Sequence, residues 1–165
     1  MRPFTRSGAS LAEIEAAYTR RFREYASLAT AILNDREAGC DAVQEAFAKA
    51  VRTRSSFRGD GSLDAWLWRA VVNTARDEQR RRAHDAARRA SFGEPSTNGH
   101  EPADDVVALI SRLPERQRLV LFLRYYADLD YAAIAEILGV AVGTVAATLN
   151  AAHTMLRRRL EGVQT

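Results

Sequence analysis

The side chains best suited to a chemical role form a polar series at helical spacing in the middle of the chain. They recur at spacings of three and four, so they occupy one broad face of a helix. They are Asn73, Arg76, Asp77, Arg80, Arg81 and His84. Arginine and asparagine contact phosphates and base edges, whereas an aspartate repels phosphate unless it pairs with an arginine or accepts from a base amino group. The series indicates a nucleic-acid-binding helix.

Groupings typical of an enzyme are missing from the sequence. The histidines His84, His100 and His153 are scattered, and with Cys40 as the only cysteine they leave no plausible zinc site. The chain has no Walker-type loop, no Gly-x-Ser-x-Gly and no His-Glu-x-x-His. We expect a non-enzymatic protein with no catalytic residue, no metal and no cofactor.

The charge of the chain is uneven along its length. The formal net charge is +3, yet residues 1–90 carry 17 basic and 12 acidic side chains, whereas residues 91–165 carry 7 and 9. All basic residues except Lys49 are arginine, which binds phosphates and bases in a bidentate manner. A GC-rich genome would give the same arginine and alanine content. The two halves therefore differ electrostatically, and the first half is the one with basic excess.

The sequence gives no sign of export or membrane insertion. Its longest apolar run, at 119–123, is far too short to span a bilayer. The N-terminus shows no signal peptide, and the single Cys40 fits a reducing compartment. We expect a cytoplasmic protein.

Hydrophobic periodicity predicts three helices in residues 1–90. A capping box of Ser10 and Glu13 opens the first, which ends at Asn34. The second begins at about Ala38, and Ser62 caps the third. The expected buried positions are Leu11, Ile14, Tyr18, Phe22, Tyr25, Ala29 and Ile32 or Leu33 in the first helix, Val43, Phe47 and Val51 in the second, and Leu63, Trp66, Leu67, Ala70, Val71 and Thr74 in the third.

A change in composition separates these helices from a second helical group. The segment SFGEPSTNGHEPADD is rich in glycine, proline, serine and acid, which is typical of a linker, although an ordered loop is the alternative. Beyond it we expect a short helix that stops before Pro114, a helix after it, a helix capped by Asp128 or Asp130 and ended by Gly139, and a last helix over about 142–160. The expected buried positions of the helix after Pro114 and of the last helix are Leu119, Val120, Phe122, Leu123, Tyr126, Val142, Val145, Leu149, Ala152, Leu156 and Leu160. The fold predicted is all-α, with two small helical bundles joined by a flexible linker.

Residues 130–160 have the layout of a helix–turn–helix, which also occurs as a plain corner between two helices. The wider stretch LPERQRLVLFLRYYADLDYAAIAEILGVAVGTV, residues 113–145, closely resembles the C-terminal promoter-binding domain of bacterial sigma factors of the extracytoplasmic-function (ECF) type. In the first half, CDAVQEAFAKA resembles the helix that grips the coiled-coil of the polymerase's largest subunit. FRGDGSLDAWLWRAVVNTARDEQRRR resembles the promoter-melting segment. The chain is similar to this family over most of its length.

The resemblance implies a role for each part of the chain. Residues 1–85 would form a sigma region 2-like domain that binds polymerase and recognises and melts the minus-ten element, 86–104 a linker, and 105–165 a region 4-like domain that recognises the minus-thirty-five element. The implied polymerase contacts are Asp41, Gln44, Glu45 and Phe47. The implied minus-ten contacts are Phe57, Arg58, Trp68, Asn73, Arg76, Asp77, Arg80 and Arg81.

Promoter melting needs aromatic rings on which unpaired bases can stack, each stack contributing roughly 1–3 kcal/mol. Phe57, Trp66 and Trp68 are the rings at hand in the melting segment. Trp66 lies on the apolar stripe and is expected in the core. Trp68 lies off that stripe and is the ring we expect to be exposed.

The last helix departs from the family, whose members carry Lys, Ser and Arg after Val-Gly-Thr-Val. This chain has Ala146, Ala147 and Thr148 there, and no lysine or arginine before Arg157. Readout would then come from thymine-methyl contacts, from an amide on adenine, and from backbone amides at the helix start. The implied minus-thirty-five contacts are Gly143, Thr144, Ala147, Thr148 and Asn150.

Three functions compete at this point. An ECF sigma factor would bind core RNA polymerase and promoter DNA, with an anti-sigma protein as a partner that the sequence leaves open. A sigma-like mimic would bind an anti-sigma protein without directing transcription, and the basic-free last helix motivates this alternative. A stand-alone helix–turn–helix repressor ranks last, since it needs no tryptophan-bearing melting segment. The basic first half favours the sigma factor.

Overall fold

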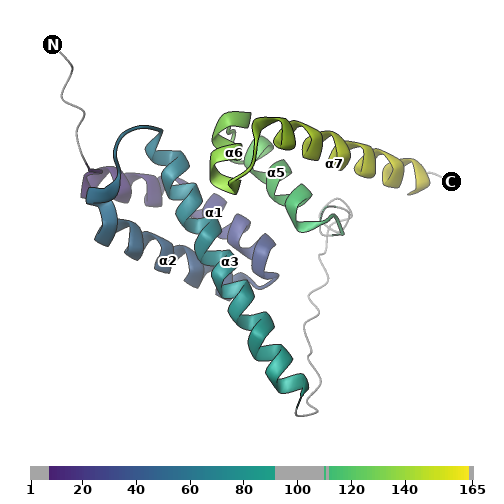
Figure 1. The fold of residues 1–165 in the computed structure, drawn as a ribbon, viewed down its shortest axis with the longest axis horizontal. Coiled ribbons are helices and arrows are strands. Elements are labelled where there is room, and N and C mark those ends of the chain that lie inside the picture. The colour runs from purple at the N-terminus through teal and green to yellow at the C-terminus, as the bar shows by residue number, and fades with distance from the viewer. Residues whose placement is uncertain (1–7, 92–109, 111, 164–165) are drawn as a thin grey trace. The chain divides into compact units, whose positions relative to one another are not determined.

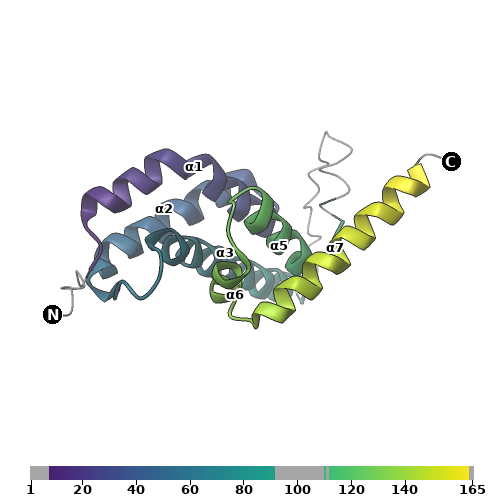
Figure 2. The same ribbon diagram turned by 90° about the horizontal axis from the view of Figure 1, so that it is seen from above.

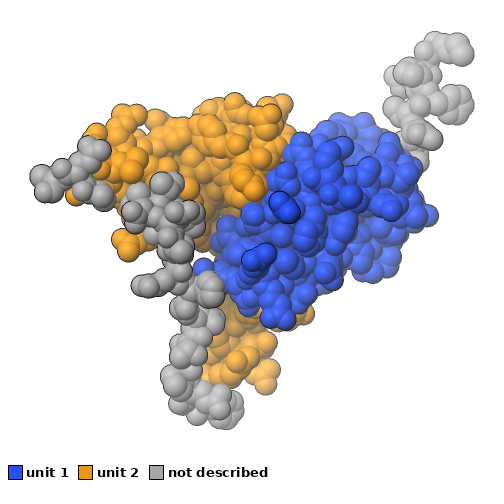
Figure 3. Space-filling model, turned by 180° about the vertical axis from the view of Figure 1, so that it is seen from behind, with its two compact units in different colours: residues 1–79 blue, residues 80–165 orange. Residues whose placement is uncertain are grey.

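The computed structural model describes residues 8–91, 110 and 112–163, and all regular structure in these residues is helical. The chain divides into two compact units, residues 1–79 and 80–165, so the division falls within one long helix (Figures 1 and 3). The predicted all-α fold with two helical groups is confirmed.

The first helix, α1, spans Leu11–Leu33 and begins with the predicted capping box. Glu13 N donates to Ser10 Oγ over 3.2 Å, and Ser10 N donates to Glu13 Oε2 over 2.9 Å. The helix is kinked at Arg21, where φ is −124° and ψ is 19°. Leu11 is exposed, contrary to expectation, because the buried stripe begins one turn later at Ile14.

The second helix, α2, spans Arg36–Thr53 and lies beside α1 in both ribbon views (Figures 1 and 2). It starts two residues before the expected Ala38, because Asp35 Oδ1 accepts from Ala38 N over 3.2 Å and so caps the helix. The two helices approach closely at Gly39, where a Cβ atom would lie 2.5 Å from Thr30 Oγ1 and 2.8 Å from Thr30 N. The absence of a side chain at residue 39 is therefore what lets α1 and α2 pack.

A 3-10 turn, η1 (Arg54–Ser56), and a loop lead to the long helix α3, Leu63–Ala90. Ser62 Oγ caps α3 by accepting from Ala65 N over 3.0 Å, as expected. The first turns of α3 cross the α1–α2 layer (Figures 1 and 2), and a helix that crosses two others needs a wide apolar face. The buried residues of α3 are Ala65, Leu67, Trp68, Val71, Val72, Thr74 and Ala75.

The second unit contains α5 (Glu115–Tyr125), α6 (Tyr131–Leu138) and α7 (Val142–Val163), and all three pack against one another. Leu119, Val120, Leu123, Val145, Leu149 and Ala152 are buried as expected. Tyr126, Val142 and Leu160 are instead about half exposed. Tyr126 is exposed because it follows the last residue of α5. In α7, Val142 precedes the first buried residue, and Leu160 lies two turns beyond the last buried residue.

The predicted linker is only partly within the described residues. Its first five residues, 86–90, are helical, because α3 continues through a run of alanine and arginine, which are strong helix formers. Arg88 and Arg89 in the last turn also complement the helix dipole. Residues 92–104, and the short helix expected before Pro114 except for Ile110, Arg112 and Leu113, lie outside the described residues.

No single helix in the described part of the chain is long and apolar enough to cross a membrane. Only α6 and α7 taken together, with a bend of 100° between them, reach that length and composition.

Candidate nucleic-acid and polymerase interface

The polar series of α3 lies on the outside of the helix. Asn73, Asp77, Arg80 and Arg81 are exposed, and Arg76 is half-buried. The helix is anchored up to Gln79, whose Nε2 donates to the carbonyl oxygen of Ile32 at the end of α1 over 3.0 Å. Beyond that anchor residues 80–84 are exposed on every side, so the basic part of α3 projects more surface than the one-sided face expected from the sequence.

The loop before α3 brings two aromatic rings together. Phe57 and Trp66 are both half-buried, and their ring centroids are 5.7 Å apart with a tilt of 55°. Arg58, the next residue, is exposed. Tilted rings at this separation are a favourable pair that keeps part of each face open. The loop therefore presents an aromatic surface next to a guanidinium group.

The exposure expected of Trp68 is wrong. Trp68 is fully buried, and its ring lies 4.3 Å from that of Tyr25 in α1. The expectation assumed a narrow apolar stripe through Trp66, whereas the wide inner face of α3 takes in Trp68 and leaves Trp66 at its edge. Trp68 consequently cannot stack on a base, and the ring that lies beside Phe57 is that of Trp66.

The polar cluster of α2 is on the surface, but its aromatic neighbour is not. Asp41, Gln44 and Glu45 are all exposed, and Glu45 pairs with Lys49 one turn later over 3.0 Å. Phe47, which was expected to contact the polymerase, is only 5% exposed. Its ring packs edge-on against Tyr18 at 5.0 Å and Tyr25 at 5.1 Å, so Phe47 belongs to the core.

Tyr25 is the centre of this aromatic core. It is fully buried between the rings of Phe47 and Trp68, and its hydroxyl has no hydrogen-bond partner among the described residues. Burial, and then the nearby charge of Asp64, raise the pKa of the Tyr25 hydroxyl well above its usual range. Tyr25 therefore stays neutral at any working pH and acts as an apolar packing residue.

The helix–turn–helix layout is present in α6 and α7. Asp130, rather than Asp128, caps α6, since its Oδ1 accepts from Ala133 N over 2.7 Å. Gly139 ends α6 in the left-handed conformation with φ of 65°, as expected. The 100° bend between the two helices lies within the range of DNA-binding helix–turn–helix pairs.

The first turns of α7 carry the small residues expected to read bases. Gly143, Ala147 and Asn150 are exposed, whereas Thr144 and Thr148 are half-buried. The hydroxyl of Thr148 donates to the carbonyl oxygen of Thr144 over 2.7 Å. With that hydroxyl committed to the helix backbone, the exposed surface here offers methyl groups, one amide and the backbone around Gly143.

A basic helix, an aromatic loop and a helix–turn–helix in one helical protein form a combination typical of DNA-binding transcription factors. Among the described residues no group of three or more His, Cys, Asp or Glu could hold a metal ion.

The family model for sigma-70 region 2 matches residues 17–85, and the model for sigma-70 region 4 matches residues 103–156.

Curated relatives give the same result over both domains. The chain is 31% identical to the RNA polymerase sigma-H factor of Pseudomonas aeruginosa, over 78% of this chain and 76% of that protein. It is 34% identical to the ECF RNA polymerase sigma-E factor of Haemophilus influenzae (73% and 74%) and 33% identical to that of Escherichia coli K12 (73% and 73%). The chain therefore belongs to the sigma-70 family, and within it to the ECF sigma factors.

Solved structures share the fold. The sigma factor RpoE of Bartonella quintana, in complex with the anti-sigma factor NepR, aligns with a TM-score of 0.76 at 21% identity, over 92% of this chain and 98% of that one. CnrH, in complex with the cytosolic domain of CnrY, aligns with a TM-score of 0.69 at 21% identity, over 93% and 91%. Sigma factors bind core RNA polymerase and promoter DNA to initiate transcription, and this chain carries both sigma domains.

Proposed function

We propose that this ECF sigma factor opens promoters mainly through α3 and the loop before it. The observation that carries this proposal is the exposed basic segment of α3, which belongs to the same helix as Trp66, the ring that pairs with Phe57. Arginine neutralises backbone phosphates, and a ring surface receives an unpaired base. The residues proposed to act here are Phe57, Arg58, Trp66, Asn73, Arg76, Asp77, Arg80 and Arg81.

The proposed polymerase contact is the exposed face of α2. Asp41, Gln44 and Glu45 lie on consecutive turns and offer two carboxylates and an amide. Such groups at an interface rim set the choice of partner and the association rate more than the final affinity. The basic side chains of the polymerase coiled-coil, implied by the family resemblance, are the matching partner.

The proposed role of α7 is to recognise the minus-thirty-five element through weaker contacts than those of α3. Methyl groups of Ala147 and Thr148 would contact thymine, Asn150 would contact adenine, and backbone amides near Gly143 and Thr144 would meet one phosphate. None of these contacts brings a full positive charge. The C-terminal domain would therefore contribute specificity more than affinity.

The same proposal covers the domain boundaries, the absence of enzymatic activity, the cellular location and one more partner. We propose a region 2-like domain of residues 1–85, a linker of residues 86–104 whose first five residues continue α3, and a region 4-like domain of residues 105–165. We also propose that the chain is not itself an enzyme, since the polymerase performs the chemistry, and that it works in the cytoplasm, where the chromosome lies. Because the sigma factor RpoE of Bartonella quintana was solved with an anti-sigma factor, we propose that this chain also accepts one.

Run-off transcription with core polymerase on a pool of genomic fragments from the source organism tests the function. We expect discrete transcripts that appear only when the protein is added. No transcript above the background of core polymerase alone would contradict the sigma function and favour the sigma-like mimic. Omission of the protein, with core polymerase alone, is the control.

A further inference from the structure

The short segment before α1 is bonded to the loop that carries the aromatic surface. Gly8 N donates to the carbonyl oxygen of Phe57 over 2.8 Å, and Ala9 N donates to the carbonyl oxygen of Arg54 over 2.9 Å. Phe57 N also donates to the carbonyl oxygen of Arg54, over 3.3 Å, which closes the η1 turn. The segment Gly8–Ala9, called the strap below, thus holds the backbone of Phe57 itself.

We propose that the strap positions the Phe57 ring, and the loop after it, to receive an unpaired promoter base. The proposal rests on the function proposed above, because it concerns the same aromatic surface. Gly8 and Ala9 are positioning residues in it: they touch the loop backbone and not the DNA.

The conformation of Gly8 shows that the strap is specific. Its φ is +101°, a region that residues with an L side chain rarely adopt. A Cβ atom at Gly8 would also lie 3.4 Å from Ser55 Cα and 3.5 Å from the carbonyl oxygen of Arg54, so space alone does not exclude it. An L side chain at position 8 would therefore disturb the strap through backbone strain rather than through a clash.

The strap is continuous with a rigid element. Ala9 is 7% exposed, and the next residue, Ser10, is fixed by the capping box with Glu13. The strap is consequently not a loose end laid over the loop: it is the extension of α1. Its two backbone bonds tie the loop to the helix that forms one wall of the core.

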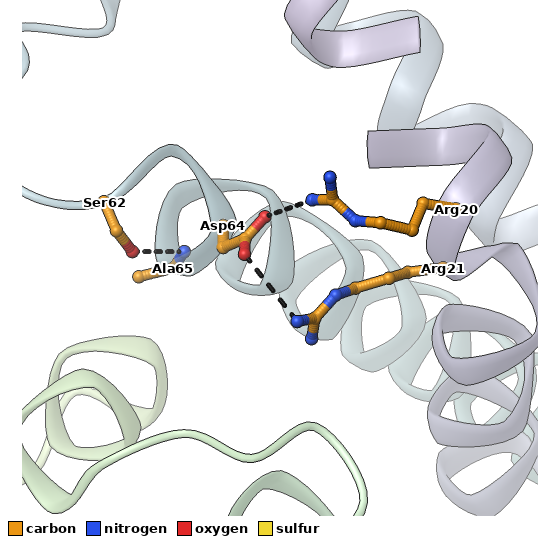
Figure 4. A network of polar contacts seen from close by, with 5 residues as sticks. All are labelled: Arg20, Arg21, Ser62, Asp64 and Ala65. Carbon is orange, nitrogen blue, oxygen red and sulfur yellow. Dashed lines mark hydrogen bonds and ion pairs between the residues drawn. The ribbon is translucent and has the colours of Figure 1, made fainter. Parts of the chain in front are cut away.

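The other end of the same loop is also tied to α1, by weaker contacts (Figure 4). Asp64, in the first turn of α3, lies 3.6 Å from an Arg20 nitrogen and 4.0 Å from an Arg21 nitrogen. These are long, partly exposed ion pairs, which contribute little. Since the loop is held at its far end by such pairs and by the Ser62 cap, the strap is the firmer of its two ties to α1.

The single cysteine gives a direct route to the test. A synthetic peptide of residues 1–39, ending in Gly39, can be ligated to a recombinant fragment that begins at Cys40. The route yields the full chain with Gly8→Ala, with Gly8 replaced by D-alanine, which favours positive φ, or with Gly8 replaced by glycolic acid, which puts an ester oxygen in place of the N–H and so removes that donor. Gly162→Ala is the matched control, because a Cβ there meets nothing and its φ is ordinary.

Open complexes are measured by the permanganate reactivity of unpaired thymines on the strongest promoter recovered in the run-off experiment. The affinity of each variant for core polymerase and its thermal unfolding midpoint are measured in parallel. We expect Gly8→Ala and the glycolic acid variant to reduce opening about fivefold, in line with one lost hydrogen bond, with polymerase affinity unchanged. The D-alanine variant should restore opening to within about twofold. Equal opening by wild type and the glycolic acid variant would overturn the proposal, whereas failure of the wild type itself would overturn the proposed function instead.

Discussion

The two helices assigned to DNA differ sharply in charge. The outer part of α3 carries six arginines between residues 76 and 89, whereas α7 carries no lysine or arginine from its start at Val142 until Arg157. Both helices have an inner face in a core and an outer face that is exposed. The two helices are thus alike in how they pack, but only α3 offers positive charge to phosphates in the part assigned to DNA.

The contrast separates affinity from specificity. Each phosphate contact proposed for α3 would release counterions and strengthen binding to any sequence, whereas the methyl and amide contacts proposed for α7 would distinguish bases but add little general attraction. A sigma factor built in this way would depend on α3 for holding and opening DNA. The recognition helix would then select among sites that α3 already holds.

The largest expected effect separates the two faces of α3. Trp68→Ala should lower the free energy of unfolding by about 3–5 kcal/mol, because it removes a fully buried ring from the aromatic core. Trp66→Ala should lower it by about 1 kcal/mol, yet it should reduce promoter opening, because the ring beside Phe57 is lost. Urea unfolding and permanganate footprints measure the two quantities.

Phe57→Leu is the matched variant on the same surface, and it should follow Trp66→Ala in both measurements. A Trp68→Ala protein that is as stable as wild type would show that the inner face of α3 is assigned wrongly.

The next prediction adds charge to the neutral helix. Ala147→Arg places a guanidinium on the exposed face of α7 and should strengthen DNA binding severalfold, with the slope of log K against log salt steeper by about one unit. Fluorescence anisotropy across a salt series measures the slope. Ala147→Gln is the neutral control. An unchanged slope for the arginine variant would mean that this face of α7 does not meet DNA.

The smallest expected effect concerns the core behind α3. Tyr25→Phe removes a buried hydroxyl without a hydrogen-bond partner among the described residues, so stability at neutral pH should be unchanged or higher by about 1 kcal/mol. The pKa of the Tyr25 hydroxyl is raised in the folded state, whereas in the unfolded state it has the ordinary value of about 10. Below about pH 10 the hydroxyl is neutral in both states, so Tyr25 adds no pH dependence to stability. Above about pH 10 the unfolded state loses this proton first, and the free energy of unfolding falls.

Thermal unfolding from pH 7 to pH 11 tests this. The Phe variant should resist alkaline unfolding better than wild type. A loss of stability of more than about 1 kcal/mol at pH 7 would show that the hydroxyl has a partner after all.

Features set by local chemistry were predictable from the sequence. The capping box at Ser10, the cap at Ser62 and the left-handed Gly139 all depend on residues within one turn, and all are present. The layout of α6 and α7 followed from the same kind of signal. The family was also predictable from the sequence, because the motifs of both sigma domains occur along the chain in the expected order.

Features set by packing between distant segments were not predictable in the same way. Whether Trp66 or Trp68 faces inward depends on how α3 crosses α1 and α2, and Phe47 is buried by rings from α1. The strap is made of backbone groups, so no side-chain pattern marks it. Only the fold reveals it, through the backbone hydrogen bonds of Gly8 and Ala9 and the conformation of Gly8.

The most direct test of the account compares the two helices in one assay. Holoenzymes with Arg80→Ala and Arg81→Ala together, and with Asn150→Ala, are assayed for open-complex formation on the strongest promoter from the run-off experiment, with polymerase affinity measured in parallel. The account predicts a loss of at least about thirtyfold for the arginine pair, from two charge-assisted contacts, and of about fivefold for Asn150→Ala. A larger loss for Asn150→Ala than for the arginine pair would contradict it.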